Sequence, residues 1–388
     1  MRDRTRLNHP PQAPLPEGNQ PLVAPIYQSV KFDFAGVEAT HAGLDAGGYF
    51  YSRVSNPTTR QLELTLAQMQ GRDDALVCAS GVGAIAQTLL ALLGQGDHVL
   101  CFAESYGPTR SLLRHTLAGF GVTHTMLSID DDAGIEAVLA ATPTRLVIFE
   151  SPTNPVNRIA DIARLCAAAR RAGALTLLDN TFAGPHQHGQ YDVDLYLHSL
   201  TKYVGGHGDV LGGAVIGRKE LIDSLRRSFI LFGGTLDAHA AFLLQRGLRT
   251  YHLRYQAQSE SAQQLAQAVA AHPGVDRVHY PGLATHPRHA LAREQMQHFG
   301  GVVSVDIAGG TARANAFVNA LQLFRIAASM GSPESLALPP SMLGLDQVPP
   351  ALRAGCGIGA GTVRLSVGLD DPADLIDDVL QALTVARG

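Results

Sequence analysis

Lysine is scarce in this chain of 388 residues. Only Lys31, Lys202 and Lys219 are present, so arginine supplies nearly all of the 30 basic residues. Arginine can carry surface charge, but its guanidinium stays protonated in proteins, whereas a buried lysine can lose its proton and attack a carbonyl. Lys202 lies in the run SLTKYVGGHGDVLGG, residues 199–213, between a threonine and a glycine-rich segment. A lysine retained in such a place is a candidate nucleophile.

Cysteine is also rare. The four cysteines are far apart in the chain and form no Cys-x-x-Cys pair: Cys78, Cys101, Cys166 and Cys356. This pattern argues against a disulfide framework or a zinc site and favours reduced residues in the core. The histidines, including His186, His188 and His207, show no metal-ligand spacing, so we expect loop and surface residues and no metal.

Blocks of like charge and long apolar runs are absent as well. The formal net charge is −4, which gives no electrostatic footprint for nucleic acid or for an anionic membrane. No apolar run reaches the roughly 18 residues that a membrane span needs. The charged N-terminus is not followed by the apolar segment of a signal peptide. The sequence therefore predicts a soluble cytoplasmic protein that binds neither nucleic acid nor membranes.

The composition predicts a folded protein of more than one domain. Hydrophobic residues make up 46% of the chain and charged residues 16%, which is typical of globular proteins. A chain of this length exceeds one small core. We expect an N-terminal arm rich in proline and glycine over residues 1–50, a large domain over 51–245 and a small C-terminal domain over 246–388.

From residue 56 onward, apolar runs of strand length alternate with helical patterns. Asn56 and Pro57 are typical of a helix start, and that helix should run to Met69. Strands are expected at Ala75–Ala79, His98–Phe102, Arg145–Glu150, Leu175–Asp179, Leu195–Ser199, Gly213–Ile216, Val302–Ile307 and Val363–Val367. Helices are expected at about 82–93, Asp161–Ala172, 235–271 and 312–321, and from Pro372 with Asp370 or Asp371 as cap. This alternation predicts a mainly parallel sheet covered on both faces, followed by a second α/β domain.

In such a sheet, ligands bind at the carboxyl ends of the strands. Five predicted strand ends carry glycine or polar residues: residues 79–83, 104–108, 150–155, 179–181 and 199–202. One of them, from Gly81 to Ala86, matches the dinucleotide fingerprint G-x-G-x-x-A and allows a nicotinamide-dependent oxidoreductase. That fingerprint alone is weak, and it gives no purpose to Asp179 and Lys202.

A second interpretation uses all five strand ends. A lysine that forms a Schiff base with pyridoxal phosphate needs a phosphate cradle, which helix N-terminal N–H groups and hydroxyls can provide. It also needs an acid that keeps the pyridine nitrogen protonated. Asp179 suits the nitrogen, and Tyr106 suits stacking on the ring. The cradle residues would be Gly81, Val82, Ser199 and Thr201, around Lys202.

At this point the sequence resembles the trans-sulfuration (Cys/Met metabolism) family of pyridoxal-phosphate enzymes. The similarity runs from about Ala24 to the C-terminus. Its motifs, in family order, are YSRVSNPT (51–58), the Gly81 loop, ESPTNP (150–155), DNTF (179–182), SLTKYVGGHGD (199–209), SMGSPES (329–335) and VRLSVG (363–368). The resemblance implies the type I pyridoxal-phosphate fold, with a mainly parallel seven-stranded sheet domain and a smaller C-terminal α/β domain. It also implies a homotetramer built from two dimers with shared active sites.

The resemblance further implies roles that local patterns do not assign. Tyr51 and Arg53 look like the pair that reaches the phosphate of a neighbouring subunit's cofactor. Arg364 looks like the clamp for the substrate's α-carboxylate, with Ser329 nearby and Asn154 as a second contact. Lys202, Tyr106 and Asp179 are then the candidate catalytic residues, with the lysine amine removing the Cα proton.

The reaction itself is left open by these motifs. Elimination at Cβ and elimination at Cγ use the same lysine and cofactor. The element from Tyr106 to Arg110 resembles bacterial cystathionine β-lyases, Pro108 replaces a cysteine of methionine γ-lyases, and Ala328 replaces a glutamate common in γ-acting enzymes. The motifs at 51–57 and 151–155 are more like the γ-acting branch. We therefore expect a cystathionine β-lyase, with cystathionine γ-lyase, cystathionine γ-synthase and methionine γ-lyase as alternatives.

Overall fold

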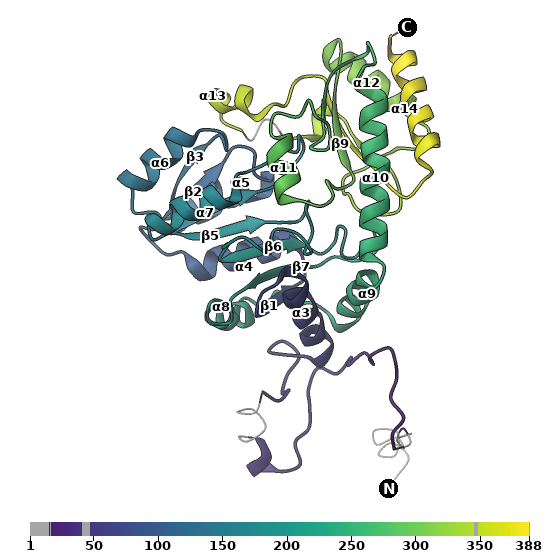
Figure 1. Ribbon diagram of the computed structural model, residues 1–388. Coiled ribbons are helices and arrows are strands. Elements are labelled where there is room, and N and C mark those ends of the chain that lie inside the picture. The colour runs from purple at the N-terminus through teal and green to yellow at the C-terminus, as the bar shows by residue number, and fades with distance from the viewer. Residues whose placement is uncertain (1–14, 16, 41–46, 345–347, 388) are drawn as a thin grey trace.

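The computed structural model of the chain describes residues 15, 17–40, 47–344 and 348–387. Two lobes, each with its own β-sheet, pack against one another, and an extended N-terminal segment projects from the larger lobe (Figure 1). This arrangement is the α/β fold with a large and a small domain that the sequence predicts.

The large domain is built on a seven-stranded sheet with the order β1-β7-β6-β5-β4-β2-β3. The strands are β1 (Asp74–Cys78), β2 (His98–Phe102), β3 (Thr123–Leu127), β4 (Leu146–Glu150), β5 (Leu175–Asp179), β6 (Leu195–Ser199) and β7 (Gly213–Gly217). Only β7 runs antiparallel to its neighbours, β1 and β6. All other pairs are parallel, so most strands deliver their carboxyl ends to one edge.

Helices cover both faces of this sheet (Figure 1). They are α3 (Pro57–Gln70), α4 (Gly81–Leu92), α5 (Gly107–Ser111), α6 (Asp132–Ala141), α7 (Ile162–Arg171), α8 (Lys219–Phe232) and α9 (Ala238–Leu248), with the short turns η1 (Leu112–Thr116) and η2 (Leu117–Phe120). Because strand side chains alternate between faces, Leu100 and Phe102 of β2 enter one buried cluster, and Val99 and Cys101 enter another. Burial on both faces explains the nearly continuous apolar runs.

Local sequence signals start several of these helices. The Asn56 side chain accepts a hydrogen bond from the Thr58 N–H at 2.8 Å, and Pro57 occupies the first turn of α3. At α4, the Ser80 hydroxyl accepts from the Gly83 N–H at 3.0 Å. Each cap satisfies an N–H group that lacks a partner inside the helix. The predicted start of the first helix is therefore confirmed.

The small domain has a five-stranded sheet with the order β10-β11-β12-β9-β8. Its strands are β8 (Val275–His279), β9 (Val302–Ile307), β10 (Arg325–Ile326), β11 (Leu336–Leu338) and β12 (Thr362–Ser366). Its helices are α10 (Tyr251–Val269), α11 (His289–Gln295), α12 (Gly310–Ala320), α13 (Pro350–Arg353) and α14 (Pro372–Arg387), with the turns η3 (Pro340–Met342) and η5 (Ala354–Cys356). Asp371 caps α14, since its carboxylate accepts from the Ala373 N–H at 2.9 Å.

The long helix α10 connects the two domains. Near its start, Tyr251 and Tyr255 pack with Tyr203, which follows β6 of the large domain. Its last turns, from Ala262 to Val269, belong to the core of the small domain. The predicted limit between residues 245 and 246 falls inside α9, just before this helix, and stays a prediction.

The N-terminal segment is anchored at only a few points. The Tyr27 N–H donates to the Thr58 hydroxyl at 2.9 Å, and the Asn56 amide donates to the Tyr27 carbonyl at 2.7 Å. Apolar side chains of the segment are nevertheless exposed, with Leu22 at 97% and Phe50 at 54%. The described part of the predicted arm thus presents apolar surface to the outside; residues 1–14, 16 and 41–46 of that arm lie outside the described residues.

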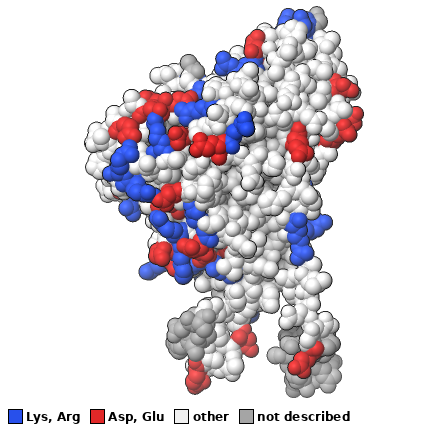
Figure 2. All heavy atoms as spheres, viewed as in Figure 1, with Lys and Arg blue, Asp and Glu red and all other residues white. Residues whose placement is uncertain are grey.

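Charged side chains of both signs are mixed on the outer face of the large domain that carries α6 and α7 (Figure 2). Arg171 of α7 pairs with Glu136 of α6 at 2.8 Å, and Arg164 pairs with Asp132. The four cysteines are buried and free, as expected of core residues. Within the described ranges, no helix has the length and apolar character to cross a membrane, and no group of three or more potential ligands is placed to hold a metal.

Candidate active site

The carboxyl ends of the large-domain strands open into a cavity of about 440 Å³ that the small domain closes on one side. Large-domain residues in its lining are Gly81, Val82, Tyr106, Pro108, Glu150, Asn154, Asp179, Thr181, Ser199, Thr201, Lys202 and Leu211. Small-domain residues in its lining are Ala328, Ser329, Met330, Leu338, Met342, Leu343, Gly344 and Arg364. The structure therefore brings together every predicted site residue except Tyr51 and Arg53.

The glycine loop lies against the end of β6. A Cβ atom on Gly81 would come within 2.7 Å of the Ser199 Cβ, so only glycine allows this approach. Thr201 lies beside them, and its hydroxyl accepts from the Gly212 N–H at 3.1 Å. The first residues of α4, Gly81 and Val82, therefore line the cavity next to two hydroxyl residues, an arrangement that suits an anion such as phosphate.

Asp179 ends β5 and is held by the residue two positions further on. Its carboxylate accepts from the Thr181 hydroxyl at 2.6 Å and from the Thr181 N–H at 3.1 Å. The same hydroxyl accepts from the Ser199 N–H at 2.9 Å, which ties β5 to β6. Burial raises the pKa of Asp179, while both hydrogen bonds from Thr181 oppose that rise. A fixed acid of this kind can hold a basic ring nitrogen in its protonated form.

Lys202 follows β6 and points across the cavity to the small domain. Its Nζ donates to the Ser329 hydroxyl at 3.0 Å. Burial, with a smaller effect of the Arg364 charge, lowers the pKa of Lys202 below its usual range. Both effects favour the neutral amine, which is the nucleophilic and proton-accepting form.

Arg364 on β12 is 6% exposed. Its guanidinium donates to the Asn154 side-chain oxygen at 2.9 Å and to the Ser329 carbonyl at 2.6 Å, whereas its buried Nε has no hydrogen-bond partner. Burial lowers its pKa to about 10. Ser329 itself has a φ of 126°, a region that non-glycine residues seldom adopt. A buried guanidinium with unused hydrogen-bonding capacity is suited to bind a carboxylate.

Tyr106 lies at the start of α5, with 38% of its surface exposed at the cavity. Its backbone N–H donates to the Glu150 carboxyl group. Burial raises the pKa of Tyr106, and the nearby charge of Asp179 adds to the rise. The phenol is therefore neutral around pH 7, and Tyr106 lines the cavity.

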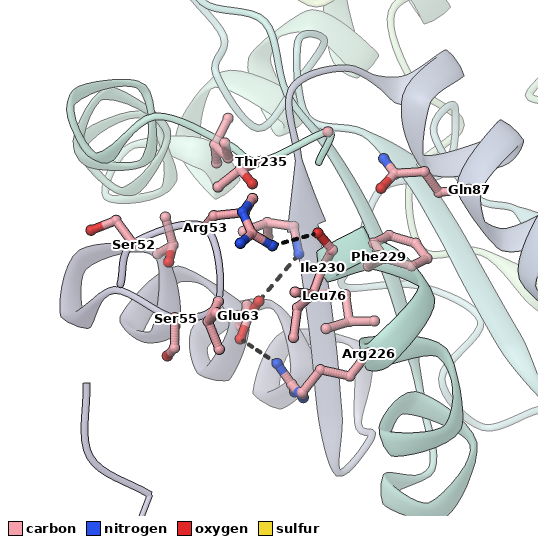
Figure 3. Close-up of a pocket in the computed structure, with 15 residues that line it drawn as sticks. Ser52, Arg53, Ser55, Glu63, Leu76, Gln87, Arg226, Phe229, Ile230 and Thr235 are labelled. Carbon is pink, nitrogen blue, oxygen red and sulfur yellow. Dashed lines mark hydrogen bonds and ion pairs between the residues drawn. The ribbon is translucent and has the colours of Figure 1, made fainter. Parts of the chain in front are cut away.

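Tyr51 and Arg53 lie elsewhere: Arg53 lines a small hollow between α3, β1 and α8 (Figure 3), and Tyr51 is exposed two residues before it. The Arg53 guanidinium donates to the Ile230 carbonyl at 3.2 Å and lies 5.7 Å from the centre of the Tyr51 ring. Arg226 and Glu63 line the same hollow. Neither predicted phosphate ligand thus reaches the cavity of its own chain, and their role toward a second subunit stays a prediction.

Two residues of the site had no assigned role in the sequence. The hydroxyl of Thr181 links Asp179 to β6, and the carboxyl of Glu150 holds the Tyr106 turn. The signal for Glu150 lies in the strand register, because β4 and β5 pair Glu150 directly with Asp179. That register cannot be read from either strand alone.

A cavity at the sheet's carboxyl edge, with a buried lysine, an acid and an arginine, is typical of enzymes that use pyridoxal phosphate. The chain matches the family described as Cys/Met metabolism PLP-dependent enzyme over residues 7–384. It therefore belongs to that family, whose members are pyridoxal-phosphate-dependent lyases or synthases with the type I fold.

Individual relatives agree with this family assignment. The chain is 43% identical over 387 residues to L-methionine gamma-lyase of Pseudomonas putida, covering 98% of this chain and 96% of the relative. It is 40% identical over 335 residues to the chloroplastic cystathionine gamma-synthase 1 of Arabidopsis thaliana, covering 86% and 60% of the two chains. A crystal structure of cystathionine gamma synthase from Xanthomonas oryzae pv. oryzae, in complex with aminoacrylate and cysteine, has a TM-score of 0.89 at 36% identity. That alignment covers 94% of each chain.

The residues of this chain fit the family's cofactor. The contact of Gly81 with Ser199 leaves a cradle that a Cβ atom would fill. Lys202 is partly buried with a lowered pKa, as a lysine that attacks an aldehyde requires. Asp179 lies within the same cavity as the lysine and the cradle. The donors present thus match a phosphate, an aldehyde and a basic ring nitrogen.

Proposed function

We propose that Lys202 holds pyridoxal phosphate covalently and also removes the substrate's Cα proton. Gly81, Val82, Ser199 and Thr201 would bind the phosphate, Asp179 the ring nitrogen and Tyr106 the ring face. When bound, the cofactor supplies an electron sink for the carbanion at Cα. Lys202 suits the proton transfer because burial favours its neutral form.

Arg364 would bind the substrate's α-carboxylate, with Asn154 and Ser329 orienting the guanidinium. Both residues already accept hydrogen bonds from Arg364. Ser329 also accepts from Lys202 at 3.0 Å, so the carboxylate site and the lysine are tied to the same residue. This link would keep the Cα–H bond of a bound amino acid near the amine.

For the reaction, we propose cleavage of the C–S bond at Cγ of a methionine-like substrate. The observation that carries this proposal is the uncharged wall of the cavity, made by Val82, Pro108, Leu211, Ala328, Leu338, Met342 and Leu343. A small apolar sulfur substituent suits such a wall. The second amino-acid group of cystathionine would need charged partners there, because unpaired charges are costly to bury.

The relatives support the same choice. Those reported above are named for γ-reactions, methionine gamma-lyase and cystathionine gamma-synthase, and they give the expected β-lyase activity no particular support. Pro108 and Ala328 still distinguish this cavity from the γ-acting pattern. Cystathionine β-lyase activity is therefore the second candidate.

The keto acid decides between these reactions. The wild-type enzyme with bound cofactor is incubated separately with methionine and with cystathionine, and the products are identified by mass spectrometry. γ-Elimination gives 2-oxobutyrate from both substrates. Pyruvate from cystathionine, with no turnover of methionine, would instead establish the β-lyase.

We also infer that the site is shared between subunits of a homotetramer of two dimers. Leu211 and Met342 line the cavity wall but are 64% and 49% exposed, which supports a neighbouring subunit that would cover them. Arg53 lies outside its own cavity, on a segment with exposed apolar residues. The domain limits at 50 and 245 and the cytoplasmic location belong to the same set of predictions.

Subunit mixing tests the shared site. Arg53→Ala and Lys202→Ala should each be nearly inactive alone, because each removes one residue from every site. Mixed dimers should regain activity, since one of their two sites keeps both residues. No recovery after subunit exchange has been verified by native mass spectrometry would place Arg53 outside the partner's site.

A further inference from the structure

Glu150 is a buried acid that the proposed reaction does not use. It ends β4, is 6% exposed and lies beside Asp179 in the β4–β5 register. Side chains paired across parallel strands point to the same face of the sheet. The carboxyl groups of Glu150 and Asp179 therefore lie side by side at the base of the cavity.

Arg110 is the basic residue whose charge acts on Glu150, but among the described residues the two form no ion pair. Arg110 of α5 donates to the backbone carbonyls of Ala103 and Ser105 and, at 3.4 Å, to that of Gly344. Glu150 thus lies beside Asp179 and the Tyr106 N–H, while the Arg110 guanidinium hydrogen-bonds to backbone carbonyls.

The environment favours the protonated form of Glu150. Burial raises its pKa well above the usual range, and the charge of Asp179 raises it further. The Tyr106 N–H, the charge of Arg110 and the backbone of Asn154 act in the opposite direction and are weaker. Two neighbouring carboxyl groups resist joint ionisation, so one of the pair keeps its proton.

The strongest contact of Glu150 is with the backbone of Tyr106, whose N–H donates to it. Tyr106 stands at the N-terminus of α5, where no side chain of the helix caps the turn. Helix N-termini leave N–H groups without partners, and an acceptor from outside can fix them. Glu150 supplies that acceptor across 44 residues of sequence.

We propose that Glu150 is a positioning residue, present as a neutral carboxyl group, that fixes the Tyr106 turn at the cavity by accepting the Tyr106 N–H. The inference rests on the proposed function in one respect, namely that Tyr106 contacts the cofactor ring. Asp179 then carries the single negative charge of the pair toward the ring nitrogen, while Glu150 orients the turn.

Four variants of the holoenzyme test this inference. Glu150→Gln keeps a neutral acceptor of similar shape, and Glu150→Leu removes it. Glu104→Gln and Glu104→Leu are matched controls, because Glu104 is also buried (4% exposed) near the Tyr106 turn but hydrogen-bonds to Ser128 and Ile129. The readouts are hydrogen–deuterium exchange of the peptide spanning residues 105–111, the absorbance of bound cofactor, and kcat/KM with methionine.

In Glu150→Leu, exchange of that peptide should rise about tenfold and kcat/KM should fall about tenfold, as expected for one buried hydrogen bond. Glu150→Gln should stay within about threefold of the wild type in both. The Glu104 variants should leave exchange in residues 105–111 unchanged. Unchanged exchange in Glu150→Leu, or a Gln variant as impaired as the Leu variant, would overturn the proposal.

A second measurement serves if Glu150→Leu does not fold. The absorbance of bound cofactor is titrated with pH in the wild type and in Glu150→Gln. A neutral Glu150 predicts the same midpoint in both, whereas an ionised Glu150 predicts a lower midpoint in the variant, because a negative charge that stabilised the protonated imine is lost. A lower midpoint would refute the neutral carboxyl. A wild-type protein without a borohydride-sensitive chromophore would instead refute the proposed function, and exchange at residues 105–111 could still be measured.

Discussion

The base and the wall of the cavity are built in different ways. At the base, Glu150, Asp179 and Arg364 stand on strands of the two sheets, and Lys202 lies three positions after the end of β6. Each of these ionisable side chains has a hydrogen bond within the site. The wall comes mainly from loops and short helical turns, as at Leu211, Ala328 and Met342.

This difference separates chemistry from selectivity. Residues on strands are positioned by the sheet and change little when a loop changes. Loop residues can be exchanged without loss of the fold, and they adapt a common site to different substrates. We therefore expect substitutions at the base to lower turnover, most of all at Lys202 and Asp179, and substitutions in the wall to redirect it.

The largest effect should come from Lys202→Ala. Loss of the amine removes both the covalent attachment and the proton acceptor, so kcat should fall by at least about 10³-fold. The borohydride-sensitive absorbance should disappear as well. Lys219→Ala is the control, because Lys219 pairs with Asp223 at 2.8 Å on the exposed side of α8. Mapping of the borohydride-fixed cofactor to Lys31 or Lys219 would contradict the assignment.

Asp179→Ala should come next. The variant should still bind cofactor through Lys202 and the cradle, but kcat should fall by about 10²- to 10⁴-fold because an unprotonated ring is a poor electron sink. Absorbance measures binding, and the keto acid measures turnover. Asp194→Ala is a suitable control, since Asp194 hydrogen-bonds to Thr176 on the same strand without lining the cavity. A near-normal rate in Asp179→Ala would mean that another acid protonates the ring.

The base could be predicted from the sequence because its residues have strong local signals. Lys202 is one of three lysines, and Asp179 closes an apolar run of strand length. Contacts between residues far apart in the chain could not be predicted from local patterns. Arg364 and Asn154 are 210 positions apart, and only the family resemblance joined them.

Parts of the fold escaped prediction for a different reason. The edge strand β3 contains the polar segment Thr123–Thr125 and is largely not buried, so it lacks the apolar run of a central strand. The strand β8 is similarly exposed over Asp276 and Arg277. The long helical pattern at 235–271 proved to be two helices, which meet at Arg249 and Thr250.

A change in the wall should have a smaller effect and a different character. Ala328→Glu introduces a carboxylate at an exposed point of the apolar wall. The ratio of kcat/KM for cystathionine to that for methionine should rise about three- to tenfold, since a charge favours a zwitterionic substituent and disfavours an apolar one. Cofactor absorbance should not change. Ala141→Glu, exposed at the end of α6, is the control, and equal losses for both substrates would show that residue 328 does not contact the substituent.

The smallest effect concerns the stability of the base. Because the pKa of Glu150 is raised in the folded protein, the folded state keeps a proton that the unfolded state releases above about pH 4.3. Stability from this group therefore falls as pH rises from that value toward the folded pKa. Glu150→Gln removes the dependence, so its Tm relative to the wild type should rise as the pH increases above about 4.3. The apoprotein at fixed concentration is used, and Glu260→Gln on the exposed side of α10 is the control.

Parallel Tm curves for Glu150→Gln and the wild type would show that Glu150 ionises in the folded protein as it does in the unfolded chain. Glu150 and Asp179 would then both be charged, and Glu150 on β4 would not be the neutral carboxyl group that we propose.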